Sequence, residues 1–124
     1  NKFLCKINPY KLKYNSINKW YDTNLILNKK LLDNKEVLQR IFIPKSTISR
    51  GLKVRNWENG DKIFSKFYKA NIRVKKIFIN NKISKFDKSI FPILTDLDNS
   101  IICIPGLFNK NTNTESSTKI YWTR

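Results

Sequence analysis

The residue types that most often carry enzyme chemistry are scarce in this sequence. No histidine occurs, and the two cysteines, Cys5 and Cys103, lie far apart with no further cysteine near either. A zinc site, which needs several such ligands at close spacing, is therefore not expected. The glycines Gly51, Gly60 and Gly106 are never adjacent, so no glycine-rich loop can cradle nucleotide phosphates. Carboxylates paired for general acid–base work are also lacking. We expect no catalysis by this chain alone and no cofactor.

Positive charge is the strongest feature of the composition. The chain carries 25 Lys and Arg against nine Asp and Glu, a formal net charge of +16 on 124 residues. Such an excess repels itself unless a polyanion neutralises it. Nucleic acid is the first candidate, because each phosphate contacted by Lys or Arg releases condensed counterions. A membrane partner is not expected, since neither an apolar run near 20 residues nor a Lys-rich amphipathic helix is evident. Polyanion binding is favoured over a purely solubilising role.

Many candidate contact residues lie between residues 53 and 88. Lys53 and Arg55 alternate with apolar neighbours, which is typical of a half-buried strand with cations on its open face. Trp57 could stack on an exposed base, and burial in the core is the equal alternative. The other candidates gather near one predicted helix and its exit, where an ordinary solvated face is the alternative to phosphate contacts. They are Arg73, Lys75, Lys76, Lys82, Lys85 and Lys88, and Lys62, which follows Gly60-Asp61, is a further candidate.

Local patterns predict the elements that would position these side chains. They are a strand at 52–55, a turn at 59–61, a helix at 70–81, a short helical turn at 84–90, and a hairpin at 93–104 with its turn at 97–99, closed at 105–106. Gly60 accepts a positive φ without steric penalty, which favours the turn. Val74, Ile77 and Phe78 would line one face of the helix. Cys103 lies in an apolar run and is predicted to be a buried thiol, with a disulfide to Cys5 left open.

The flanking segments carry weaker signals. Residues 1–20 mix Lys, Asn and aromatics without a period and are expected to form an extended basic arm. Residues 21–40 are expected to be partly helical, and residues 40–44 form a short strand halted by Pro44. Residues 109–124 are expected to be a polar flexible tail, with residues 120–122 as a possible edge strand. The predicted fold class is α+β, with a small mixed or antiparallel sheet and one or two helices. One domain, residues 21–108, lies between arm and tail.

One set of motifs carries a family resemblance. Arg55 is followed after four residues by Gly60-Asp61, and three further pieces appear downstream at residues 75–83, 90–94 and 101–107. Together they resemble the C-terminal domain of tRNA(Ile)-lysidine synthetase, over residues 50–108. That enzyme uses ATP to attach lysine to the wobble cytidine of an isoleucine tRNA. The resemblance implies a tRNA-binding α+β domain. The Ser-Gly-Gly-x-Asp-Ser loop of the family's catalytic domain is absent.

Two functions follow as hypotheses. The first is a non-catalytic RNA-binding protein that serves as a structural subunit of an organellar ribosome or similar RNA-rich assembly, with rRNA and other proteins as partners. The alternative is the tRNA-binding fragment of a split tRNA(Ile)-lysidine synthetase that acts with a separate catalytic chain. Asn, Lys and Ile make up 53 of the 124 residues, which indicates an AT-rich coding sequence. A mitochondrion or plastid is therefore expected, with the cytoplasm of an AT-rich bacterium as the alternative.

Overall fold

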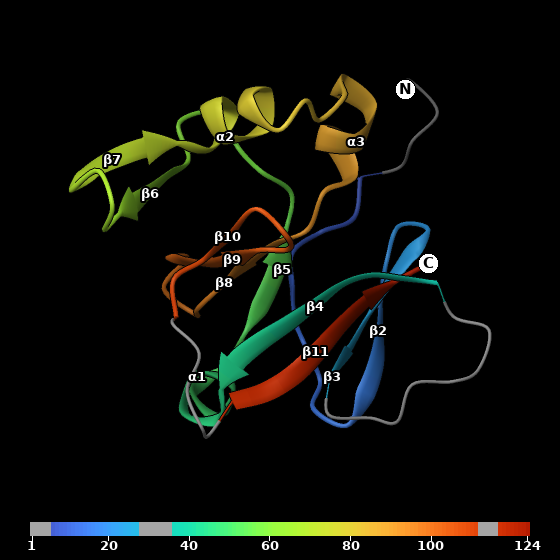
Figure 1. Ribbon diagram of the computed structural model, residues 1–124. Helices are drawn as coiled ribbons and strands as arrows, with labels where there is room; N and C mark the ends of the chain where they lie inside the picture. Colours follow the sequence, from blue (N-terminus) through green and yellow to red (C-terminus); the bar gives the residue numbers. More distant parts are fainter. Residues whose placement is uncertain (1–5, 28–35, 112–116) are drawn as a thin grey trace.

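The chain folds into three layers in a computed structural model that describes residues 6–27, 36–111 and 117–124. A four-stranded sheet in the order β2-β3-β11-β4 forms one outer layer, and a five-stranded sheet in the order β1-β5-β8-β9-β10 forms the middle (Figure 1). The third layer contains the hairpin β6–β7 and the helices α2 and α3. Every strand pairing among the described residues is antiparallel. The predicted α+β class is confirmed, with three short helices where one or two were expected.

The elements follow one another closely along the chain. In order they are β1 (Tyr10–Lys11), β2 (Ser16–Trp20), β3 (Thr23–Leu27), β4 (Val37–Pro44), α1 (Lys45–Arg50), β5 (Lys53–Arg55), β6 (Lys62–Ser65), β7 (Ala70–Arg73), α2 (Val74–Asn80), α3 (Lys85–Ile90), β8 (Ile93–Thr95), β9 (Ile101–Ile104), β10 (Phe108–Asn109) and β11 (Ser117–Thr123).

The middle sheet is buried on both faces, which explains the continuous apolar run of β9. Leu94 and Ile102 belong to a first core shared with the four-stranded sheet. Ile93 and Ile104 belong to a second core, which they share with Val74 and other residues of the third layer. Strands covered on both faces read as continuous apolar runs rather than as alternating ones. The middle sheet therefore contributes to both cores and joins the third layer to the rest of the domain.

The expected basic arm is wrong for residues 6–20, while residues 1–5 lie outside the described residues. Part of this segment forms β1 and β2, and Leu12 and Trp20 are buried in the first core. The indole N–H of Trp20 also donates to the carbonyl of Ile90 at 2.8 Å. Burial of two large apolar side chains stabilises the segment more than its lysines and asparagines disfavour it. The segment is thus an integral part of the domain.

Long-range pairing overrides the local pattern at the other flanks. The predicted helix at 21–40 is wrong for residues 23–27 and 37–40, which form β3 and part of β4, and residues 28–35 lie outside the described residues. The expected edge strand near residues 120–122 is an interior strand, since Ile120 lies opposite both Leu27 and Ile41. Strand Ser117–Thr123 also shortens the predicted tail. Such pairings join residues far apart in sequence, which a local periodicity cannot reveal.

Locally encoded features are confirmed. Strand β4 ends at Pro44, Gly60 has a φ of +98°, and the hairpin of β8 and β9 has the predicted turn. Helix α3 follows Ser84, whose side chain accepts a hydrogen bond from the amide of Asp87 at 3.0 Å. The helix predicted at 70–81 begins later, at Val74, because residues 70–73 pair with β6.

Cys103 is a free, fully buried cysteine, and burial raises the pKa of its thiol to about 12. Cys5 lies outside the described residues. Within the parts of the chain that the structure describes, no helix is long and apolar enough to cross a membrane. The same residues contain no group of three or more His, Cys, Asp or Glu side chains that could hold a metal ion.

Candidate nucleic-acid interface

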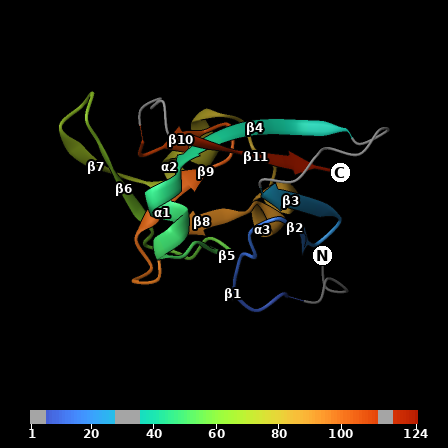
Figure 2. The ribbon, with the colours of Figure 1, turned by 90° about the horizontal axis from the view of Figure 1, so that it is seen from below.

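Most of the predicted contact residues lie in the third layer, formed by residues 57–91. This segment contains nine Lys and Arg residues against three Asp and Glu. It covers one face of the middle sheet, and its hairpin projects beyond the rest of the molecule (Figures 1 and 2). The exposed cations of the layer are Lys62, Lys66, Lys69, Arg73, Lys75, Lys76, Lys82 and Lys85. The structure therefore gathers cations from several elements on a single layer.

The hairpin β6–β7 brings two of these cations side by side. Lys62 lies opposite Arg73 in the register, and the neighbouring pair Ile63 and Ile72 packs against the second core. Alternation along a strand places the charged pair on the other face of the hairpin from the isoleucine pair. The apolar pair thus anchors the hairpin while Lys62 and Arg73 remain exposed.

The hairpin turn is basic and aromatic, and sequence reasoning missed it. Phe67 and Tyr68 are 86% and 69% exposed, and their rings meet edge to face with centroids 4.9 Å apart. Lys66 and Lys69 flank them, and Lys69 has a φ of +53°. Gly and Asn are the residues that usually signal such a conformation, so a turn built on lysine gives no local signal. Residues 62–65 carry no alternation of polar and apolar types either, because apolar Phe64 follows apolar Ile63 and is exposed in the strand.

Helix α2 continues directly from the hairpin and presents two more lysines. Val74 and Phe78 are buried in the second core, and the amide of Val74 donates to the carbonyl of Asp61 at 2.9 Å. Lys75 and Lys76 are exposed in the first turn, which contains no acidic residue. Cations near a helix N-terminus oppose the helix dipole. Local helix stability therefore does not account for these two lysines.

Arg55 is buried, so the predicted cation on an open strand face is wrong at this position. Its residue exposure is 4%, and its guanidinium makes a bidentate pair with Asp61 at 2.8 and 3.0 Å. It also donates to the carbonyl of Asn56 at 2.9 Å and to the side-chain oxygen of Asn99 at 2.7 Å. The physical reason is a sheet buried on both faces, in which a cation persists only when it is paired. The guanidinium of Arg55 is therefore engaged within the protein, where it holds Asp61 and the side chain of Asn99.

A small polar network ties the third layer to the sheets. Asp61 accepts the amide of Glu58 at 2.7 Å as well as the guanidinium of Arg55, which fixes the turn before β6. The side chain of Asn56 donates a hydrogen bond to the carbonyl of Ser89 at 2.6 Å and accepts one from the hydroxyl of Tyr21 at 3.0 Å. These contacts fix the ends of the layer against β5 and the β2–β3 turn.

Trp57 has a packing role in this structure. It is partly buried against the second core, and its ring meets Phe78 edge to face with centroids 5.9 Å apart. The ammonium of Lys88 lies over the same ring, 5.1 Å from its centroid. A cation above an indole is favourable. Of the two alternatives left open for Trp57, packing against the core matches its position. Lys88 contacts the ring of Trp57.

Lys53 lies apart from the other candidates. It is half-buried on β5, directly opposite Lys11 of β1 and Thr95 of β8. Two like charges facing each other across a strand pair destabilise a sheet. Lys82, in contrast, follows α2 in the third layer with a φ of +55°, and Lys85 begins α3. The predicted set thus divides into a cluster in the third layer and two residues of β5 outside it.

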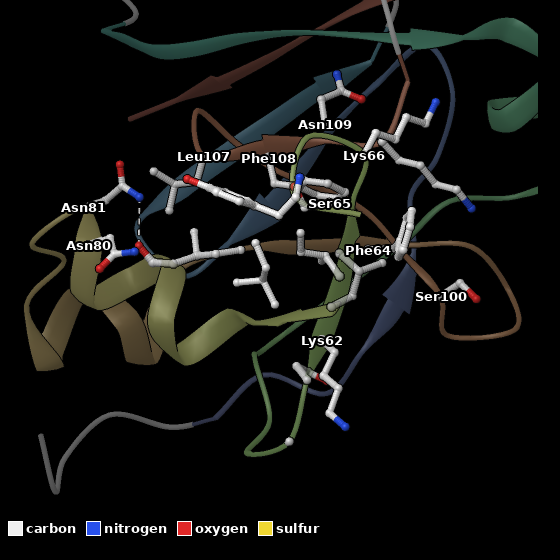
Figure 3. Close-up of a pocket in the computed structure, with 18 of the residues that line it drawn as sticks. Lys62, Phe64, Ser65, Lys66, Asn80, Asn81, Ser100, Leu107, Phe108 and Asn109 are labelled. Atoms are coloured by element: carbon white, nitrogen blue, oxygen red, sulfur yellow. Dashed lines mark hydrogen bonds between the residues drawn. The ribbon is translucent and has the colours of Figure 1, made fainter. Parts of the chain in front are cut away.

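A groove runs between the third layer and the middle sheet, with a volume of about 750 Å³. Figure 3 shows Asn80 and Asn81 at one end, where α2 terminates, and Phe64, Lys66 and Ser100 at the other. Apolar side chains of both layers also line it, namely Ile63, Ile72, Ile77, Ile101, Leu107 and Phe108. The groove therefore combines apolar walls with amide, hydroxyl and ammonium groups.

Within the described parts of the chain, no carboxylate pairs with an exposed cation of this layer. Among the described residues, the ion pairs involve only Arg55 with Asp61, and Arg124 with Asp22 and Glu36. Exposed cations without carboxylate partners raise the local positive potential and attract a polyanion. The layer consequently combines exposed positive charge with exposed aromatic side chains, which are features expected of a nucleic-acid-binding surface.

Comparison with known proteins agrees with the resemblance in the sequence. No family model matches the chain. A tRNA(Ile)-lysidine synthase of Oceanobacillus iheyensis is 30% identical over 104 residues, which cover 82% of this chain and 21% of the relative. The enzyme of Bacillus licheniformis is 41% identical over 56 residues, 45% of this chain and 12% of the relative. The bifunctional protein TilS/HprT of Listeria monocytogenes is 33% identical over 70 residues, 56% of this chain and 11% of the relative. The matched segment therefore spans about a fifth or less of the length of each relative.

The fold likeness extends over almost the whole chain. The crystal structure of the TilS C-terminal domain superimposes with a TM-score of 0.69 and 20% sequence identity, covering 94% of this chain and 97% of that one. The likeness therefore extends well beyond residues 50–108, to which the sequence motifs were confined. The chain has the fold of the TilS C-terminal domain, and its sequence is similar to a limited part of tRNA(Ile)-lysidine synthases.

Proposed function

We propose that this domain binds tRNA through its third layer and serves a tRNA(Ile)-lysidine synthase whose catalytic domain lies outside these 124 residues. The observation that carries the proposal is the match to the TilS C-terminal domain, combined with a layer of unneutralised cations. The curated relatives are lysidine synthases or a bifunctional TilS/HprT protein, which favours this reading over that of a ribosomal subunit. The chain itself contributes binding and orientation of the RNA and no reacting group.

Phosphate contacts provide the binding energy in this proposal. Lys75 and Lys76 follow Arg73 of the Lys62–Arg73 pair after one buried residue, Val74, so the cations continue from the hairpin onto α2. Each phosphate neutralised adds to the salt dependence of binding, and exposed charge pairs contribute up to about 1 kcal/mol each. Folded RNA is recognised through its shape, its phosphates and its 2′-hydroxyl groups.

A pair of lysine variants tests the location of the interface. We expect Lys75→Ala/Lys76→Ala to weaken tRNA binding about tenfold and to reduce the slope of log K against log salt by about 1.5. The matched control is Lys19→Ala/Lys119→Ala, which removes the same charge from exposed positions on the four-stranded sheet. Fluorescence anisotropy with a labelled tRNA at several salt concentrations measures both quantities. An equal loss in the two variants would contradict an interface on the third layer.

The link to lysidine formation requires a separate test. A catalytic domain bearing the Ser-Gly-Gly-x-Asp-Ser loop, supplied with ATP, lysine and isoleucine tRNA, should form lysidine faster when this chain is added. If a saturating concentration of this chain left the rate of lysidine formation unchanged, the proposed role in a synthase would be contradicted, whereas the proposed tRNA binding would not. We also propose that the protein acts in a mitochondrion or plastid, because its abundance of Asn, Lys and Ile indicates an AT-rich coding sequence. Fractionation of the source cells tests this localisation.

A further inference from the structure

The groove between the third layer and the middle sheet has the chemistry of a nucleotide site. Its volume of about 750 Å³ falls in the range of small-molecule pockets, about 300–1,000 Å³. The bases of double-helical RNA cannot enter such a pocket, because they are paired and stacked inside the helix. Single unpaired nucleotides can present both faces and edges. Resting on the proposed RNA-binding function, we infer that this groove binds unpaired nucleotides of the RNA.

Exposed aromatic rings provide surfaces on which bases can stack. Phe64 and Tyr68 line the groove from the hairpin and are 58% and 69% exposed, so burial does not account for either ring. Phe108, half-buried, lines it from the side of β10. Every base has an apolar face that can stack on such rings. These three side chains are the stacking surfaces of the site.

Side-chain amides near the ends of the groove can read base edges. The side chain of Asn80, at the end of α2, makes no hydrogen bond to another described residue. The amide nitrogen of Asn81 is held by the carbonyl of Ile77 at 2.8 Å, which leaves its oxygen as an acceptor. The oxygen of Asn99 accepts from Arg55, which leaves its amide nitrogen as a donor. Donors and acceptors with fixed positions favour a ligand with both kinds of group on its rim.

Charge complementarity selects RNA as the occupant rather than a protein segment. Lys62, Lys66 and Lys110 line the groove and are exposed. Among the described residues that line the groove, Asp61 is the one carboxylate, and Arg55 already neutralises it. Lysine is depleted at protein–protein interfaces, whereas lysines around an apolar groove can contact the phosphates that link stacked bases.

The test compares two RNAs that differ only in unpaired nucleotides. One is a blunt-ended RNA duplex with a fully paired stem, and the other carries a four-nucleotide 3′ extension on one strand of the same stem. Stacking contributes about 1–3 kcal/mol per base, so we expect the extension to tighten binding of the 124-residue chain about tenfold. Phe64→Ala and Tyr68→Ala should each reduce this ratio severalfold, with affinity for the blunt stem changed less than twofold. Both side chains are exposed, so these truncations leave the core intact.

The matched control is Phe86→Ala, which removes an exposed ring of the same type, 47% exposed, from α3 and outside the groove. It should preserve the tenfold ratio. A ratio near one in the unsubstituted chain, with the blunt stem still bound, would overturn the nucleotide site and leave the proposed function standing. A ratio that survives both Phe64→Ala and Tyr68→Ala would place the unpaired nucleotides elsewhere and would also overturn it. Failure to bind either RNA at low salt would overturn the proposed function together with the site.

Discussion

Substitution of Arg55 separates a structural role from a phosphate-contacting one. Arg55→Met removes four hydrogen bonds of 2.7–3.0 Å and leaves the carboxylate of Asp61 with only the amide of Glu58. The guanidinium and carboxylate side chains are 5% and 12% exposed, so water replaces few of these contacts. Breaking a buried pair destabilises a protein by about 3–5 kcal/mol. Because Asp61 retains some exposure and one donor, we expect the lower end, about 3 kcal/mol.

Urea unfolding followed by tryptophan fluorescence measures this loss, because Trp20, Trp57 and Trp122 report on both cores. A loss of about 3 kcal/mol is a large share of the stability of about 5–15 kcal/mol typical of a domain. A double-mutant cycle with Asp61→Asn should give a coupling energy of about 1–3 kcal/mol. Where Arg55→Met remains folded, the salt dependence of RNA binding should be unchanged.

The opposite pattern would refute the structural role. If Arg55→Met altered stability by less than about 0.5 kcal/mol, as exposed substitutions do, the pair with Asp61 would not hold the third layer. A reduced salt slope in a fully folded Arg55→Met variant would mean that the guanidinium contacts a phosphate. The cation on an open strand face that the sequence predicts would then be correct.

Four further predictions concern stability and reactivity. Because burial raises the pKa of the Cys103 thiol to about 12, a Cys5→Ser variant should not react with a thiol reagent at pH 8 until it is unfolded. In the unfolded chain this thiol loses its proton near pH 9, whereas in the folded chain it keeps the proton. The free energy of unfolding should therefore fall between about pH 9 and 12, and the fall should be smaller in Cys103→Ala. Gly60→Ala should cost about 1–2 kcal/mol through its φ of +98° alone, since an added Cβ meets no atom within 4 Å. Ser84→Ala should cost about 1 kcal/mol by removing the cap on the amide of Asp87.

Each of these has a result that would count against it. Rapid labelling of folded protein at pH 8 would mean that Cys103 is accessible. Identical pH dependence in Cys103→Ala and the unsubstituted chain would show that another group determines alkaline stability. Unfolding midpoints that do not change for Gly60→Ala or Ser84→Ala in urea would contradict the turn strain and the cap, respectively.

The parts of the fold that could be predicted from sequence are those fixed by neighbouring residues. Pro44 lacks a backbone donor and ends a strand, Gly60 permits a positive φ, and Ser84 caps the next helix, so each acts within a few positions. Strand β11 could not be placed in this way, because its position depends on pairing Ile120 with Leu27 and Ile41. The β6–β7 hairpin was missed because its turn has Lys69 where a glycine would have been a signal.

The candidate site shows the same division. Lys75 and Lys76 were predicted correctly as exposed helix cations, since helical spacing already separated them from the buried face of Phe78. Arg55 was misplaced because alternation of apolar and basic residues suggests a sheet with one open face, whereas this sheet is covered on both. The groove could not be predicted, because residues as distant as Phe64 and Phe108 meet there.

The most direct test of tRNA binding is an equilibrium measurement with the purified 124-residue chain. Affinities for an isoleucine tRNA transcript and for duplex DNA with the same number of phosphates would be compared across a range of salt concentrations. We expect tRNA to bind more tightly than the DNA at every salt concentration, with an affinity that falls steeply as salt rises. Equal affinity for both polymers would mean that net charge alone explains the interaction, and absence of tRNA binding at low salt would contradict the proposed function.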